Sequence, residues 1–157
     1  MRLLTALSCV SFVLGIAIAQ TAKPGAGPCA LITKAEVQEA VGSPVAEGVV
    51  NRTNPNVCDF KIGATGSAVS IMLTRKSPVD SAEKTVDALK KSKINAEVVA
   101  GFGDSAYASS PGYGMQQLGV YQGSSHVIAT VLILGSPEAK AKAVAQAVMR
   151  KALARVP

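Results

Sequence analysis

Beyond residue 28, apolar and polar positions alternate with two periods, one typical of helices and one typical of strands. A first helix is predicted between Thr33 and Gly42. Thr33 and Glu36 have the spacing of a capping box, and glycine is a common residue just after the last turn of a helix. Because this helix is short and carries one apolar stripe, we expect it to lie on a sheet.

Three strands are expected after this helix, over residues 45–50, 57–62 and 68–74. In the middle segment, VCDFKI, Cys58 and Phe60 fall on the apolar face of the alternation. The pattern therefore predicts that Cys58 points inward, toward the first helix.

Two further helices are expected. One begins at Ser77–Pro78, a capping residue followed by proline at the first helical position, and its apolar stripe consists of Val79, Ala82, Val86 and Leu89. The last runs from Ser136–Pro137 to about Leu153, with Glu138 in its first turn, where the helix dipole favours a negative charge. The apolar side of the last helix is predicted to contain Ala141, Ala145, Val148, Met149, Ala152 and Val156.

The remaining strands are expected over residues 94–99 and 106–108 and in a hairpin of 115–121 with 126–134. Runs of strands joined by short turns, interrupted by single helices, are typical of an α+β fold. We expect a mostly antiparallel sheet with three helices packed against it, in one domain over residues 29–157.

The first twenty residues, MRLLTALSCVSFVLGIAIAQ, have the pattern of a secretory signal. A positive Arg2 precedes an apolar run that ends in a small-x-small site at Ala17–Ala19. Residues 1–19 are therefore predicted to be cleaved, and residues 20–28 to form a flexible lead-in rich in Gly and Pro. The alternative is an uncleaved anchor, for which the run is at the lower limit of length. Cleavage predicts an exported protein, periplasmic or secreted, without a transmembrane helix in the mature chain.

The chain has three cysteines, of which Cys9 leaves with the signal. Neither Cys9 nor Cys29 stands at the end of the apolar run, so a lipid anchor is not expected. Cys29 and Cys58 form an even pair in an oxidising compartment, which predicts a disulfide worth roughly 3.5 kcal/mol. A paired cysteine has no thiolate, and a zinc site needs about four ligands, for which only His126 remains. Neither a nucleophilic cysteine nor a metal site is expected.

Removal of residues 1–19 takes away one basic residue, so the mature net charge is 15 − 10 = +5. An excess of this sign favours an anionic partner. The candidate anion-binding face lies on the last helix and consists of Lys140, Arg150, Lys151 and Arg155; the alternative is a solvated helix face. An anionic envelope surface or an envelope protein is the expected partner. Nucleic acid is not expected, because no aromatic platform accompanies the charges.

Two loops are candidates for ligand binding: Gly101, Phe102, Gly103 and Asp104, and the turn that carries Tyr113. The glycines would let backbone N–H groups approach a ligand, with Asp104 as an acceptor. The alternative is a structural corner in which Asp104 caps a turn. Tyr113 is expected to be exposed, whereas Tyr107 and Tyr121 are expected to be half-buried with their hydroxyls outward.

His126 is the only histidine, and a catalytic role would need an activated nucleophile and an orienting acid nearby. Ser124 and Ser125 precede it, but no nucleophile motif surrounds them, and no carboxylate pair stands out for acid–base chemistry. We expect a surface histidine and a non-enzymatic binding or interaction module without a cofactor. The alternative is a hydrolase whose active groups are not visible as a motif.

Four segments together resemble a broad family of bacterial exported proteins and lipoproteins of unknown function: CALITKAEVQEAVG, CDF, GFGDSAYAS and LGVYQGSSHVIATV. In that family a Cys-x-Leu-Leu-Thr-x-x-Glu opening precedes a Cys-x-Phe/Trp strand and a Gly-Leu-Gly-Asp-x-Ala-Tyr loop. Ile32 and Phe102 replace the usual leucines here. The resemblance covers Cys29 to about Leu153. It implies a disulfide-braced α+β envelope domain and no established activity.

Overall fold

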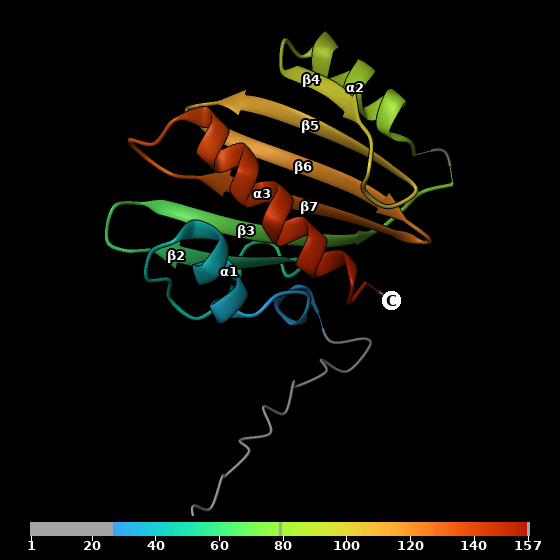
Figure 1. Ribbon diagram of the computed structural model, residues 1–157. Coiled ribbons are helices and arrows are strands. Elements are labelled where there is room, and N and C mark those ends of the chain that lie inside the picture. Colours follow the sequence, from blue (N-terminus) through green and yellow to red (C-terminus); the bar gives the residue numbers. More distant parts are fainter. Residues whose placement is uncertain (1–26, 79, 157) are drawn as a thin grey trace, which may run out of the picture.

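The computed structural model describes residues 27–78 and 80–156, which form one antiparallel sheet with helices packed on it (Figure 1). The described helices are η1 (Pro28–Ala30, a single 3₁₀ turn), α1 (Lys34–Val41), α2 (Ala82–Lys91) and α3 (Glu138–Leu153). The strands are β1 (Val49–Val50), β2 (Val57–Ile62), β3 (Ser67–Arg75), β4 (Asn95–Val99), β5 (Ser105–Gly112), β6 (Met115–Gln122) and β7 (Ser125–Leu132). The α+β prediction is confirmed, with every strand pairing antiparallel.

The strands lie in the order β1-β2-β3-β7-β6-β5-β4, so a helix followed by a run of consecutive strands occurs twice along the chain. The two runs join where β3 pairs with β7, in the middle of the sheet (Figure 1). The predicted hairpin of the second half is confirmed as β6 and β7, which are joined by a tight turn at residues 123–124.

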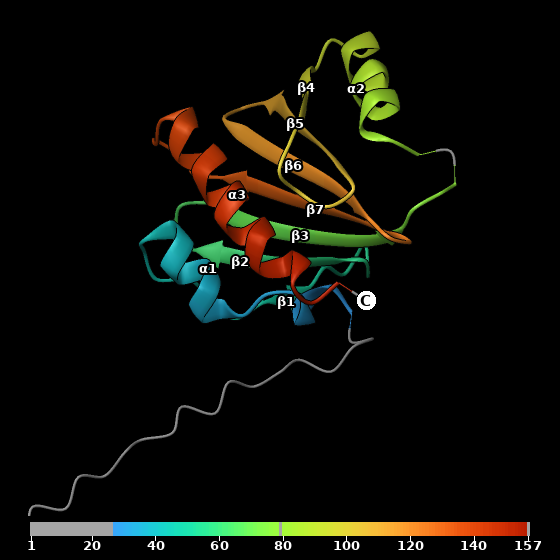
Figure 2. The same cartoon turned by 45° about the vertical axis from the view of Figure 1, so that its right-hand side comes forward.

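The main core lies between the sheet and the two helices α1 and α3, which cover the same face (Figures 1 and 2). Val69 and Ile71 of β3 and Val127 of β7 are fully covered there, as the alternation of β3 and β7 requires. The apolar side of α3 is buried as predicted, with Val144 as an additional member and Val156 half-buried at the end.

Both ends of α1 have the predicted caps. The backbone N–H of Glu36 donates to Thr33 Oγ1, and the backbone N–H of Thr33 donates to Glu36 Oε2, which completes the capping box. Gly42 ends the helix in the left-handed region, at φ +73°. The sequence did not predict that Arg155 reaches back to the same carboxylate, with Nη2 at 2.8 Å from Glu36 Oε1 and Nη1 at 2.9 Å from Glu36 Oε2. This pair fastens α1 to the chain just beyond α3.

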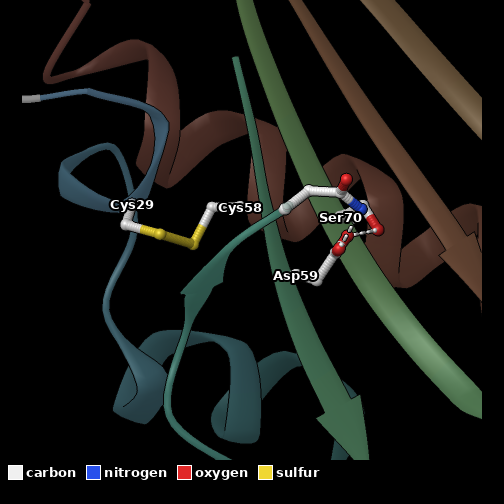
Figure 3. Close-up of a disulfide and its surroundings, with 5 residues drawn as sticks. Cys29, Cys58, Asp59 and Ser70 are labelled. Atoms are coloured by element: carbon white, nitrogen blue, oxygen red, sulfur yellow. Dashed lines mark hydrogen bonds between the residues drawn. A yellow bond between two sulfur atoms is a disulfide. The ribbon is translucent and has the colours of Figure 1, made fainter. Parts of the chain in front are cut away.

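The predicted disulfide is confirmed. Cys29 and Cys58 are bonded, with 5.0 Å between their Cα atoms. Figure 3 shows that Cys58 leaves β2 toward Cys29, while the next residue, Asp59, leaves β2 toward Ser70 on the other side. The bond therefore ties the segment before α1 to the inner face of the sheet.

Several boundaries differ from the predictions. The segment 45–50 pairs only through a bridge of Val45 with Ile62 and through the two residues of β1. Strand β5 runs from Ser105 to Gly112 rather than over 106–108, so the turn that carries Tyr113 has only two residues. Pro28, which was assigned to the flexible lead-in, is buried in η1.

Helix α2 begins later than predicted. Its cap is Ser81, whose Oγ accepts from the N–H of Lys84, and Ser77 does not cap it. The reason lies in Asp80, whose carboxylate accepts the backbone N–H of Ser77 and closes a turn before the helix. Of the predicted stripe, Ala82 and Val86 are buried, and Val79 lies outside the described residues.

The predicted signal peptide, residues 1–19, and the lead-in up to residue 26 also lie outside the described residues. Within 27–78 and 80–156, we find no helix that combines the length and the apolar character needed to cross a membrane.

Candidate functional site

The Gly101–Asp104 loop forms a corner between β4 and β5 in which Phe102, Gly103 and Asp104 make structural contacts. Phe102 is 7% exposed and packs in the main core, and the guanidinium of Arg150 lies over its ring at 4.6 Å. Asp104 Oδ2 accepts the backbone N–H of Gly123 at 2.8 Å and so caps the β6–β7 turn. Gly103 has φ +50°, and a Cβ there would lie 2.6 Å from the carbonyl oxygen of Tyr121. These contacts correspond to the structural corner rather than to an open ligand loop.

Tyr113 occupies the β5–β6 turn and is 90% exposed, as predicted. Its φ of +55° places it in the left-handed region, which a turn of this kind requires. The structure does not bring Tyr113 together with the Gly101–Asp104 corner, because β5 separates them along its whole length.

The four residues of the predicted anion-binding face do not share one environment. Lys140, Arg150 and Lys151 are exposed, and the guanidinium of Arg150 also stacks on the ring of Phe102. The charge of Arg155 is paired with Glu36, and its Nη1 also donates to the carbonyl oxygen of Leu31. At most three of the four cations are therefore available to an anion.

Helix α2 covers the opposite face of the sheet from α1 and α3, and it does so over a small second core. This core contains Ala82 and Val86 of α2 together with Ala96, Tyr107 and Tyr121. Both tyrosines are buried, and they do not turn their hydroxyls outward as predicted. A reason is the backbone at Gly119, where the absence of a side chain leaves room for the ring of Tyr107.

The tyrosine hydroxyls and His126 link α2 to the sheet. Tyr121 forms a hydrogen bond of 2.7 Å with Thr85 of α2, and its ring stacks on His126 at a centroid distance of 4.2 Å. The hydroxyl of Tyr107 lies 3.3 Å from His126 Nε2. His126 is thus half-buried on a central strand, close to the β6–β7 turn, rather than at the surface as expected.

Burial shapes the titration of this cluster. It lowers the pKa of His126, against an opposing effect of Asp80, and it raises the pKa of Tyr107 far above its usual range. Both groups are therefore neutral at neutral pH. The cluster links α2 to the sheet, because the hydroxyl of Tyr121 is bonded to Thr85 and that of Tyr107 to His126.

The part of this second face that α2 does not cover is called here the open face. The contacts of α2 with the sheet go to β4, to β5 and to β6, where Tyr121 meets Thr85. This leaves β2, β3, β7 and the Met115–Gln117 end of β6 without a helix on this side (Figure 2). Most side chains on the open face are half-buried. The positions that alternate with them along β2, β3 and β7 point into the main core, and most of those are fully buried.

A row of polar side chains crosses the open face at right angles to the strands. Asp59 of β2 is paired with Ser70 of β3, Ser70 with Thr130 of β7, and Thr130 with Gln117 of β6. We call these four residues the polar row. On β5 the row continues in Ser109, which is only 3% exposed.

Hydrogen bonds connect most of the polar row. Ser70 Oγ donates to Asp59 Oδ1 at 2.6 Å, as Figure 3 shows, and Gln117 Nε2 donates to Thr130 Oγ1 at 3.1 Å. Asn51 Nδ2 donates to the other oxygen of Asp59 at 2.7 Å. Among the hydrogen bonds of the described residues, the hydroxyl proton of Thr130 has no acceptor. The row is therefore held in place and keeps hydrogen-bonding capacity.

Apolar rows flank the polar row on both sides. One contains Met72 of β3 and Ile128 of β7, and the other contains Leu132 of β7 and Met115 of β6. An open hollow of about 660 Å³ adjoins the row at Asp59 and lies between β2, Ala68 of β3 and the β2–β3 turn.

The sequence did not reveal this surface. Each strand contributes only one residue to the row, and the row appears only when the register of the four strands is known. A usable signal was present in β3 and β7, where Ser70 and Thr130 each stand between two apolar neighbours.

No family, curated protein or solved structure in the comparisons matches this chain. Within the described residues, no group of three or more His, Cys, Asp or Glu side chains is placed to hold a metal ion.

Proposed function

We propose that this protein is an exported, non-enzymatic binding module of the bacterial cell envelope, and that the open face is its contact surface. The observation that carries this proposal is the polar row, a connected set of hydrogen-bonding side chains in the middle of a sheet face that α2 covers only in part.

The exported location is supported by the N-terminal signal pattern and by the Cys29–Cys58 disulfide, since disulfides persist in oxidising compartments. The resemblance to bacterial exported proteins rests on the same cysteines and on the Gly101–Asp104 motif. A periplasmic or secreted protein of this kind meets envelope proteins and anionic envelope surfaces first.

The non-enzymatic character is supported by the surroundings of His126. Its ring is stacked on Tyr121 and hydrogen-bonded to Tyr107, so both contacts are with aromatic side chains of the sheet. General acid–base catalysis needs a base that reaches a nucleophile or a substrate proton. The described contacts of His126 give it a packing role instead.

A retention assay tests the proposal. The mature chain is incubated with isolated envelope material, and the bound fraction is measured for the wild type and for a variant with Ser70→Glu and Thr130→Glu. The matched control places two carboxylates on the outward side of α3, at the exposed positions Ala139 and Ala143.

Loss of retention in the open-face variant alone would support the proposal. Loss in the α3 control alone would move the contact surface to the basic helix, where Lys140, Arg150 and Lys151 remain available to an anion. Equal retention of all three proteins would contradict the proposal, provided that circular dichroism shows each variant folded.

A further inference from the structure

We infer that the open face binds a linear, uncharged, β-linked glycan, which lies across the strands along the polar row. This inference rests on the proposed function and names the ligand class of the same surface.

The first argument is the repeat distance. The polar row offers one hydrogen-bonding side chain per strand, from Asp59 to Gln117. Neighbouring strands lie about 4.8 Å apart. An extended chain of β-linked pyranoses advances by a similar distance per sugar, with alternate rings turned over and hydroxyls on both edges. Each sugar in such a chain can therefore meet one polar side chain. An extended peptide repeats its side chains on one face every two residues, or about 6.7 Å, and does not match this spacing.

The second argument is the chemistry of the row. Its groups are a carboxylate, two hydroxyls and a carboxamide, which are the side chains that bond sugar hydroxyls as both donors and acceptors. Thr130 keeps a hydroxyl proton to donate, and Asp59 has further lone pairs beyond those used by Ser70 and Asn51. A partner helix has its backbone groups already bonded and would bury an apolar stripe, for which a polar row is a poor match.

The third argument is the pair of apolar rows. Met72 and Ile128 on one side, and Leu132 and Met115 on the other, flank the polar row. Pyranose rings carry apolar C–H faces beside their hydroxyls, so a glycan seated on the row would contact both kinds of surface. Unbranched methionine side chains adapt to such an irregular partner.

The fourth argument is size. Four strands span about 14 Å, and the two apolar rows lie about 13 Å apart along the strands. This patch is far smaller than the roughly 800 Å² per partner of a stable protein–protein complex. It fits a narrow ligand of about four sugars, because Ser109, the next position of the row, is covered.

Calorimetric titration of the mature protein with defined oligosaccharides tests the inference. The probes are cellohexaose and the β-linked hexamer of N-acetylglucosamine, with their shorter oligomers. Maltohexaose, an α-linked chain of different curvature, is the control ligand. We expect affinity for at least one β-linked series to rise with length up to about four sugars and then to level off, and we expect maltohexaose to bind at least tenfold more weakly.

Two matched substitutions locate the ligand. Thr130→Val removes one hydroxyl of the polar row and is expected to weaken binding about two- to twelvefold, the range of a single hydrogen bond. Thr74→Val makes the same change on the same face of the sheet, two rows away from the polar row, where Thr74 pairs with His126. We expect this variant to keep the oligosaccharide affinity of the wild type within a factor of two. Both variants keep a β-branched residue in a strand, so both are expected to fold.

Equal affinities of the two variants would overturn the placement of the glycan on the row. Absence of binding by every β-linked oligomer at millimolar concentration would contradict the inference that the ligand is a β-linked glycan. If no β-linked oligomer bound but envelope retention still depended on Ser70 and Thr130, the proposed function would stand without the glycan. Only the retention assay can contradict the proposed function itself.

Discussion

The ion pair between Arg155 and Glu36 joins α1 to the chain just after α3. Arg155→Met removes the guanidinium and keeps an unbranched apolar stem. The pKa of Glu36 is lowered from an ordinary value of 4.5 to about 2, and the hydrogen bond from Arg155 is the largest cause. Burial raises this pKa, and the hydrogen bonds from Thr33 lower it further. We expect the variant to lose part of the stability that this shift represents.

The magnitude follows from the shift. The lowering of the Glu36 pKa from 4.5 to about 2 corresponds to roughly 3 kcal/mol. The part of this lowering of the Glu36 pKa that comes from the Thr33 cap remains in the variant. Both side chains of the ion pair are partly exposed, and solvent screening weakens their interaction. A loss of about 2 kcal/mol at pH 7 is therefore expected from Arg155→Met.

Urea unfolding at several pH values measures this loss, with Lys151→Met as the matched control. Lys151 is exposed, and its replacement changes the net charge by the same amount. The carboxylate of Glu36 has a lowered pKa in the folded state, so its contribution is present above about pH 5 and disappears as the pH falls toward 2. The difference between wild type and Arg155→Met should shrink over that range. A loss at pH 7 within 0.5 kcal/mol of the control (about the spread of neutral surface changes), or a difference that does not vary with pH, would refute the reasoning.

Three further outcomes are expected. Cys58→Ala should lower the free energy of unfolding by about 2–5 kcal/mol under non-reducing conditions, and peptide mapping that finds Cys29 free in the wild type would contradict the disulfide. Gly119→Ala should lower it by about 1–3 kcal/mol, because a Cβ there collides with the ring of Tyr107; an unchanged urea midpoint would show that the ring is not held there. Asp104→Ala should cost about 1 kcal/mol through the lost cap of the β6–β7 turn, and full stability in thermal unfolding would disprove the cap.

Local signals in the sequence predicted much of the fold. The capping box of Thr33 and Glu36, the terminal Gly42 and the β-branched run of β7 each specify an element within a few residues. The Cys29–Cys58 pairing followed from the compartment and the count of cysteines. These features depend on neighbours in the chain, and sequence reasoning could therefore reach them.

Features that depend on distant partners were missed. Arg155 was assigned to an anion-binding face, but its partner Glu36 is 119 residues away. The start of α2 was placed at Ser77. The hydrogen bond from the backbone N–H of Ser77 to Asp80 is local and has the spacing of a capping box, but the helix begins after Ser81 instead. The polar row needs the register of four strands, and a shift of one residue in any strand would break it.

The methyl groups of methionine give the most direct test of the open face as a binding surface. The sequence has four methionines, and the predicted mature chain keeps Met72 and Met115, on the open face, and Met149, which is buried in the main core. Methyl-labelled mature protein is titrated with solubilised envelope material and followed by NMR. The account predicts that the signals of Met72 and Met115 shift or broaden while that of Met149 stays in place. Binding that leaves the signals of Met72 and Met115 unchanged would contradict it.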